Sequence, residues 1–204
     1  MLADLRSVAV PFVGLTGGMG AGKSTALKAL EDLGAQVLST DAVVHGLYGE
    51  SRVKDAVIER WGAEVAPAGV VDRAVVAAKA FAGGEQERKW LEGLLWPLVG
   101  ERMAAWLEHA RALRPAPRAA IVEVPLLFEA GMESGFDATI AVIAQEDTRR
   151  ARAATRGHAL AEERASRQLS QEEKAARASF VIRNDGSVAD LRRQLADVLA
   201  KLSP

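Results

Sequence analysis

The strongest constraint on the fold is a glycine-rich stretch at residues 17–24, GGMGAGKS, which satisfies the pattern G-x-x-x-x-G-K-[ST]. A short apolar run precedes it at residues 8–16, and a run with leucines at helical spacing follows it. In such a strand–loop–helix unit, inward-pointing backbone N–H groups and the positive end of the helix bind a polyphosphate. We therefore expect Lys23 to reach the β- and γ-phosphates of a nucleoside triphosphate and Ser24 to ligate Mg²⁺.

Short apolar runs alternate with helical runs along the rest of the chain. We expect strands within residues 8–16, 36–40, 119–125, 136–144 and 179–182. This alternation predicts βαβ units, and hence an α/β fold with a parallel sheet. Residues 42–114 are mostly helical in pattern and exceed a simple crossover, so we expect them to form a helical insert on a single domain of residues 1–204.

The C-terminal part of the chain carries two further helical signals. Residues 146–170 are charged and rich in arginine, which makes them a candidate lid. Ser187 with Asp190 predicts a capping box at the start of the last helix. The expected core face of that helix comprises Val188, Leu191, Leu195, Val198, Leu199 and Leu202.

The composition bounds the size and the partners of the protein. With 204 residues, of which 49% are hydrophobic, the chain suits one domain of the usual roughly 100–200 residues. A formal charge of −1 supplies no field for nucleic acid or an anionic membrane, and no stretch approaches the roughly 18–20 apolar residues of a membrane span. The chain has no cysteine, which fits a reducing cytosol without requiring one, and its short N-terminal apolar run is not expected to be a signal peptide.

Several classes of triphosphate-using protein carry a loop of this kind. A GTPase would normally carry the guanine-reading pattern N-K-x-D, which this sequence lacks, and a motor or transporter ATPase would need a longer chain. A small kinase fits the size. The residues leave two alternatives open: a kinase for another small hydroxyl or nucleotide acceptor, and a nucleotide-dependent switch that hydrolyses slowly or not at all.

Asp41 ends the second expected strand, in QVLSTDAVVH. In an open parallel sheet, ligands lie beyond the carboxyl ends of the strands, which would bring Asp41 near the transferred phosphate. There its carboxylate can accept the proton of an attacking hydroxyl. An Asp before an apolar helical run is equally suited to cap that helix, and the spacing alone does not separate the two roles.

Four stretches, in chain order, closely resemble the dephospho-CoA kinase family: GLTGGMGAGKST, LGAQVLSTDAVVH, VEVPLLFEAGM and SFVIRNDGS. The similarity covers nearly the whole chain, and PLLFE after a strand is more specific than the loop. The resemblance implies transfer of the ATP γ-phosphate to the ribose 3′-hydroxyl of dephospho-CoA by a cytoplasmic enzyme. It also implies a five-stranded, nucleoside-monophosphate-kinase-like P-loop sheet with a CoA-side helical insert and a lid.

The loop motif and the resemblance together imply roles for individual residues. Asp41 becomes the catalytic base and Lys23 the catalytic lysine, while Ser24, and Glu123 through water, would hold Mg²⁺. The expected ATP-binding residues are Gly17, Gly18, Met19, Gly20, Ala21, Gly22, Lys23, Ser24, Thr25, Arg156, Arg164 and Asn184. The expected acceptor-binding residues are Asp41, His45, Arg73, Pro125, Leu126 and Leu127. Arg73 is equally well explained as a surface residue at a helix start.

The arginines of the candidate lid have two interpretations. Guanidinium groups match phosphate oxygens bidentately, so a lid of this composition can clamp a triphosphate and neutralise transition-state charge. The other interpretation is a solvated helix face. Of the arginines between residues 149 and 168, we expect Arg156 and Arg164 to contact phosphate.

The sequence departs from the family pattern at three places. Ser39-Thr40-Asp41 stands where the family usually has D-A-D, Glu123 replaces the Asp before V-P-L-L, and Trp96-Pro97 replaces H-P. Glu123 keeps a carboxylate on a side chain one methylene longer. Four tryptophans fall in the helical insert, and we expect most of them to pack its core, with one a candidate to line the acceptor pocket: Trp61, Trp90, Trp96 and Trp106.

Overall fold

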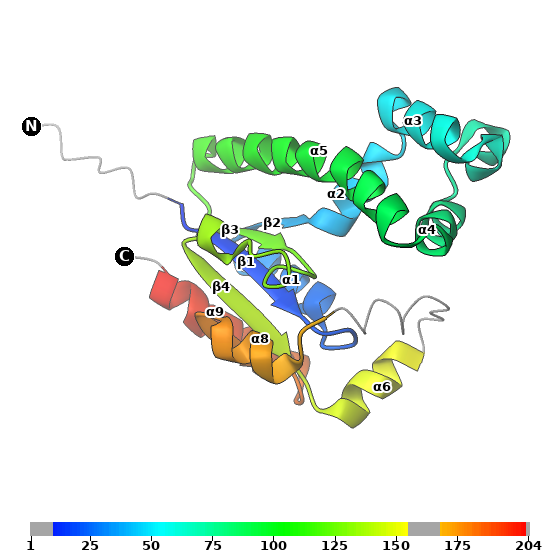
Figure 1. Cartoon of the computed structure of the whole chain (residues 1–204). Helices are drawn as coiled ribbons and strands as arrows, with labels where there is room; N and C mark the ends of the chain where they lie inside the picture. Colours follow the sequence, from blue (N-terminus) through cyan, green and yellow to red (C-terminus); the bar gives the residue numbers. More distant parts are fainter. Residues whose placement is uncertain (1–9, 155–167, 203–204) are drawn as a thin grey trace, which may run out of the picture. The chain divides into compact units, whose positions relative to one another are not determined.

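The computed structural model describes residues 10–154 and 168–202. Within these ranges, five parallel strands form one sheet in the order β2-β3-β1-β4-β5 (Figure 1). The strands are β1 (Phe12–Gly17), β2 (Gln36–Ser39), β3 (Ala120–Glu123), β4 (Ala138–Ile143) and β5 (Phe180–Arg183). β1 lies at the centre, between β3 and β4, and both of these neighbours are buried along their whole length. The parallel α/β sheet predicted from the alternation of strands and helices is confirmed.

One face of the sheet forms a hydrophobic core with α1 (Lys23–Asp32) and α9 (Val188–Leu202). Successive strand residues point to opposite faces, so Val13 and Leu15 of β1 share this face. From the last helix, Leu191, Leu195, Val198 and Leu199 are buried here, as the periodicity predicts. Val188 was expected among them but is 66% exposed, because it is the first residue of the helix and lies beyond the packed turns.

The opposite face of β1 carries Thr16, one residue on from Leu15, and is covered by α8 (Gln171–Arg177). A capping box starts α8: Ser170 Oγ accepts from the Glu173 amide at 3.1 Å, and the Glu173 carboxylate accepts from the Ser170 amide at 2.8 Å. Between β4 and α8 the chain forms α6 (Glu146–Ala154). The second capping box, predicted at Ser187 and Asp190, is confirmed by mutual hydrogen bonds of 3.1 Å.

The chain divides into two compact units, the first comprising Met1–Leu38 and Leu107–Pro204 and the second Ser39–Trp106. The second unit contains α2 (Thr40–Leu47), α3 (Ser51–Trp61), the short 3₁₀ turns Ala63–Val65 and Pro67–Gly69, α4 (Arg73–Ala82) and most of α5 (Gly84–Ala112). It has its own hydrophobic core, which includes Val53, Val57, Val65 and Val76. None of the helices in the described residues is both long enough and apolar enough to cross a lipid bilayer.

A cluster of polar and aromatic side chains joins two helices of the second unit to one another. Glu87 accepts hydrogen bonds from the indole Nε1 of Trp61 and from Nε of Arg60, both at 2.9 Å. The Arg60 guanidinium also lies 5.4 Å from the ring centre of Trp90, which meets Trp61 edge-on at 5.0 Å. Trp61 and Trp90 thus pack in the insert as expected. Trp96 does not, because its side chain is 57% exposed.

Candidate active site

The loop after β1 has the backbone that an anion-binding loop needs. Gly20 and Gly22 adopt φ values of 74° and 94°, a left-handed conformation that glycine reaches without strain. Helix α1 begins directly afterwards at Lys23, with Gly22 as its N-cap and no acidic residue in its first turn. The positive end of this helix is therefore suited to an anion.

The two glycines also let neighbouring elements approach the loop closely. A Cβ added to Gly20 would lie 2.5 Å from the carbonyl oxygen of Arg149 in α6, and one added to Gly22 would collide with the side-chain amide of Asn184. Helix α6 thus lies against one side of the loop, and the segment after β5 lies against another. The pattern of glycines in the motif has a packing reason as well as a conformational one.

Asn184 secures the loop from the end of β5. It is buried, its Nδ2 donates to the Ala21 carbonyl at 2.8 Å, and its backbone amide donates to the Ile143 carbonyl at 2.8 Å. Its own carbonyl accepts from Nη1 of Arg152 at 3.2 Å. This side chain therefore positions the phosphate loop, and its expected place near the adenine remains a prediction.

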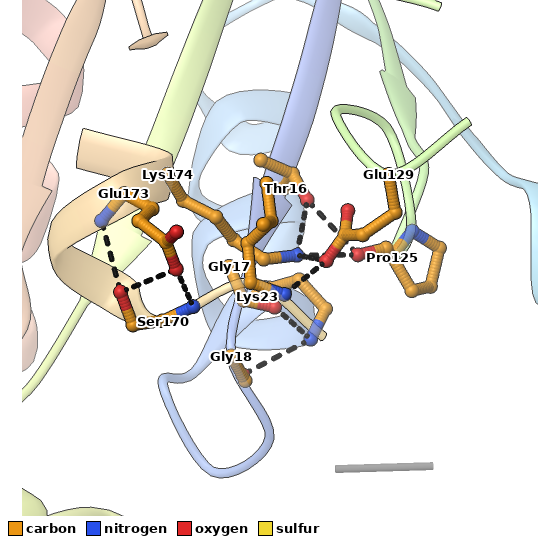
Figure 2. Close-up of polar contacts among 10 residues, drawn as sticks. Thr16, Gly17, Gly18, Lys23, Pro125, Glu129, Ser170, Glu173 and Lys174 are labelled. Carbon is orange, nitrogen blue, oxygen red and sulfur yellow. Dashed lines mark hydrogen bonds and ion pairs between the residues drawn. The ribbon is translucent and has the colours of Figure 1, made fainter. Parts of the chain in front are cut away.

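Lys23 lies over the loop that it follows. Its Nζ donates to the carbonyl oxygens of Gly17 at 3.0 Å and Gly18 at 3.2 Å (Figure 2). Ser24 and Thr25 are exposed in the first turn of α1, where their hydroxyls can meet a ligand. Met19 is half-buried, whereas Ala21 is fully buried, so Ala21 can offer a ligand only its backbone.

Glu123 is the last residue of β3 and is 7% exposed. It pairs in register with Leu15 of β1, two residues before the strand ends at Gly17. Because parallel strands end at the same edge of a sheet, this carboxylate and the phosphate loop belong to one edge, the edge at which such folds bind ligands. Within the described residues, no three carboxylate or imidazole groups gather as a metal-binding cluster.

Two arginines of α6 border the loop. Arg149 Nη1 lies 3.4 Å from the place that a Cβ on Gly18 would take, and Arg152 Nη1 lies 3.6 Å from the corresponding place on Gly22. Arg149 Nε is buried and has no hydrogen-bond partner among the residues that the structure describes. Sequence reasoning singled out Arg156 and Arg164 instead, and both lie outside the described residues.

The segment after β3 holds the predicted acceptor residues of the first unit. The Pro125 carbonyl accepts from Thr16 Oγ1 at 3.1 Å, so the segment is tied to the end of β1. The Leu127 side chain is fully buried, whereas Leu126 is 37% exposed. Of the two leucines, Leu126 is therefore the one whose side chain can meet a ligand.

The second unit holds the other predicted acceptor residues. Asp41 is exposed in the first turn of α2, which begins at Thr40 with Ser39 as its N-cap. The capping alternative for Asp41 is therefore wrong, because the strand ends one residue earlier than expected and Asp41 lies inside the helix. His45 is exposed one turn further on, and positions i and i+4 share a helix face.

Arg73 begins α4 of the second unit and is exposed. The N-cap is Asp72, whose carboxylate accepts from the Ala74 amide at 2.9 Å, so Arg73 has no part in capping the helix. Arg73 lines a shallow depression with Pro67, Val70, Val71, Asp72 and Ala74. This leaves its guanidinium available to a ligand of the second unit.

A central parallel strand that feeds a G-x-x-x-x-G-K-S loop and a helix defines the class of P-loop nucleotide-binding proteins. A sequence model of the family CoaE, dephospho-CoA kinase, matches residues 11–190. The dephospho-CoA kinase of Deinococcus radiodurans is 38% identical over 193 residues, which cover 93% of this chain and 91% of the relative. The chain therefore belongs to the dephospho-CoA kinase family.

Solved structures agree with this assignment of fold. The crystal structure of TT1252 from Thermus thermophilus has a TM-score of 0.77 and 33% sequence identity, over 96% of this chain and 100% of that one. The dephospho-CoA kinase from Campylobacter jejuni has a TM-score of 0.67 and 23% identity, over 94% of this chain and 96% of that one. The P-loop kinase fold inferred from the sequence is confirmed.

Sequence reasoning missed three residues that the structure brings to this site. Arg149 was only one of several arginines in a charged stretch, and nothing in the pattern separates it from its neighbours. Glu129 belongs to the PLLFE motif but had no assigned role. Lys174 lies in the charged run SQEEK, which predicts an exposed helix, yet it is fully buried.

Proposed function

We propose that the protein transfers the γ-phosphate of ATP to the ribose 3′-hydroxyl of dephospho-CoA and releases CoA and ADP. This reaction is the last step of coenzyme A synthesis. The observation that carries the proposal is the match of the dephospho-CoA kinase family over residues 11–190. The phosphate loop supports it, since a kinase of this class needs a strand–loop–helix unit for its phosphate donor.

The ATP site is assigned to the loop residues 17–25. Their backbone amides and the start of α1 would bind the β- and γ-phosphates, and Lys23 would pair with them. Of the lid arginines, we add Arg149 to the predicted Arg156 and Arg164, because its guanidinium borders Gly18 and its Nε is buried without a partner in the described residues. Such a group is suited to a phosphate oxygen.

The residues present suit Mg²⁺, the usual companion of ATP. Mg²⁺ prefers oxygen ligands and keeps several waters, so it needs only one or two protein groups beside the substrate phosphates. The exposed Ser24 hydroxyl and the buried Glu123 carboxylate are donors of this kind in one unit. Ser24 would hold the ion directly and Glu123 through water. When bound, the ion neutralises charge on the phosphates.

The acceptor-binding residues are proposed from the family resemblance. Asp41 would accept the proton of the 3′-hydroxyl and orient it, since it is exposed and is not needed as a helix cap. His45 on the same helix face, Arg73, Pro125 and Leu126 would contact dephospho-CoA. The helical insert is long enough to bind a large acceptor of this kind. The cytoplasm, where ATP is available, is the proposed location.

The test is a panel of acceptors with Mg-ATP, followed by mass spectrometry. We expect one added phosphoryl group on dephospho-CoA and little or no product with AMP, adenosine, gluconate or shikimate. ATP consumption without any acceptor would favour the switch or ATPase alternative. Efficient phosphorylation of another acceptor, with dephospho-CoA unchanged, would contradict the proposal and leave only a small P-loop kinase.

A further inference from the structure

Lys174 is a fully buried cation in α8. Its Nζ lies 2.9 Å from Glu129 Oε1, donates to the Pro125 carbonyl at 2.8 Å and lies 3.5 Å from Thr16 Oγ1 (Figure 2). An ammonium group has three N–H donors, and these three acceptors match them. The arrangement is therefore a complete binding site for the side chain and not an incidental contact of a surface lysine.

The partners of Lys174 come from separate parts of the chain. Thr16 directly precedes Gly17, where the phosphate loop starts, and Pro125 begins the segment assigned to the acceptor. Glu129 Oε1 also accepts from the backbone amide of Leu169 at 2.8 Å. One ion pair thus joins the start of the phosphate loop, the acceptor segment and the C-terminal end of the candidate lid.

Stability alone does not account for this choice of residues. Removing two charges from water is costly, and a well-packed apolar pair of similar volume is often as stable as a buried ion pair. The pair is also incomplete on one side, because Glu129 Oε2 is buried without a hydrogen-bond partner in the described part of the chain. What the ion pair adds over apolar packing is direction, since its hydrogen bonds hold each segment at a defined distance and angle.

We propose that Lys174 and Glu129 are positioning residues for phosphoryl transfer. The pair contacts neither substrate; it holds Thr16, residues 125–129 and Leu169 so that the loop and the acceptor segment keep one relative geometry. Transfer of a phosphoryl group depends chiefly on such positioning, and a misplacement of about 1 Å can cost roughly 10²-fold in rate. This inference rests on the proposed kinase function.

The test compares Lys174→Met, Glu129→Gln and the double variant, with Lys28→Met as a matched control. Lys28 pairs with Glu31 and Asp32 on the surface of α1 and should be dispensable. Lys174→Met leaves the Glu129 charge buried without its partner, so we expect lower thermal stability and a kcat reduced roughly 10–100-fold. The KM for ATP should change less than about threefold, because the loop itself is intact.

The double variant separates positioning from stability. It removes both charges, and the amide oxygen that replaces the Glu129 carboxylate can still accept from the Leu169 amide, so its melting temperature should return close to that of the wild type. Its kcat should stay reduced by at least about tenfold. Recovery of kcat together with stability would overturn the positioning role.

Hydrogen exchange gives a second measurement that does not depend on turnover. In the double variant, amides of residues 16–25 and 126–129 should exchange faster than in the wild type, and those of Lys28→Met should not. Unchanged exchange in the double variant would contradict the proposal. A wild type that fails to phosphorylate dephospho-CoA would refute the kinase function itself, a result that the variants cannot mimic.

Discussion

The phosphate loop and the helices of the second unit present their functional residues in opposite ways. The loop lies between a buried strand and a helix, and hydrogen bonds from Lys23 and Asn184 hold its carbonyls. Asp41, His45 and Arg73 are exposed on helix surfaces. A polyphosphate can be bound by backbone amides, so a short motif encodes its site. A large acceptor is recognised by side chains, whose relevance a local pattern cannot reveal.

Replacing Lys23 by alanine is the strongest test of the phosphate loop. We expect a loss of roughly 10³–10⁵-fold in kcat, the scale for a cation that neutralises charge on a transferred phosphoryl group. The fold should stay intact, because the ammonium donates to loop carbonyls at 3.0 and 3.2 Å and lies outside the hydrophobic core. Steady-state kinetics with circular dichroism checks this, and activity within a few-fold of wild type would remove Lys23 from the mechanism.

Asp41→Asn tests whether an exposed residue of the second unit is catalytic. If the carboxylate is a positioned base, we expect a loss of roughly 10²–10⁴-fold in kcat. The loss is smaller if the loose transition state of phosphoryl transfer depends little on a base. Ser39, not Asp41, is the N-cap of α2, so the melting temperature should barely change. An unchanged kcat would show that Asp41 is merely a surface residue of the helix.

Arg149→Ala, with Arg150→Ala as its neighbour control, tests whether the loop site extends into α6. Both arginines pair with Glu146, at 3.4 and 3.0 Å, but Arg149 borders the loop and is 24% exposed, whereas Arg150 is 75% exposed. Loss of one charged hydrogen bond to phosphate predicts a roughly 10–100-fold lower kcat/KM for ATP in the first variant only. Equal kinetics for the two variants would contradict a phosphate contact of Arg149 and favour the interpretation of these arginines as a solvated helix face.

The smallest expected effect is on the stability of the second unit. The hydrogen bond from Arg60 lowers the pKa of Glu87 below its usual range. A carboxylate with a lowered pKa adds stability above its unfolded value, roughly pH 4.3, and loses it as the pH falls through the lowered folded pKa. Glu87→Gln should therefore lower the melting temperature at pH 7 and converge with wild type at low pH.

The control for this prediction is Glu85→Gln, whose carboxylate forms an exposed pair with Lys89 one turn along α5. Exposed pairs of this kind contribute little, so its melting temperature should follow that of the wild type at every pH. A Glu87→Gln variant that behaves in the same way would mean that the cluster with Trp61 and Trp90 does not depend on the charge.

Local patterns predicted much of the fold and the donor half of the site. Strand and helix periodicity indicated the parallel sheet, and the capping box at Ser187 starts the last helix where expected. The expectations that failed concern positions at which an element ends. Val188 follows the helical period but lies beyond the packed turns, and Asp41 lies inside its helix because the strand stops one residue early.

By itself, the sequence determined the phosphate loop, because glycine spacing, strand and helix are all encoded within residues 12–32. Only the tertiary structure decided which charges are buried. Lys174 lies 158 residues from Thr16 and 49 from Pro125 in the chain, and nothing in its own helix distinguishes it from an exposed lysine. The physical reason is that burial of a polar group depends on the partners that packing brings to it, and these partners are not its neighbours in sequence.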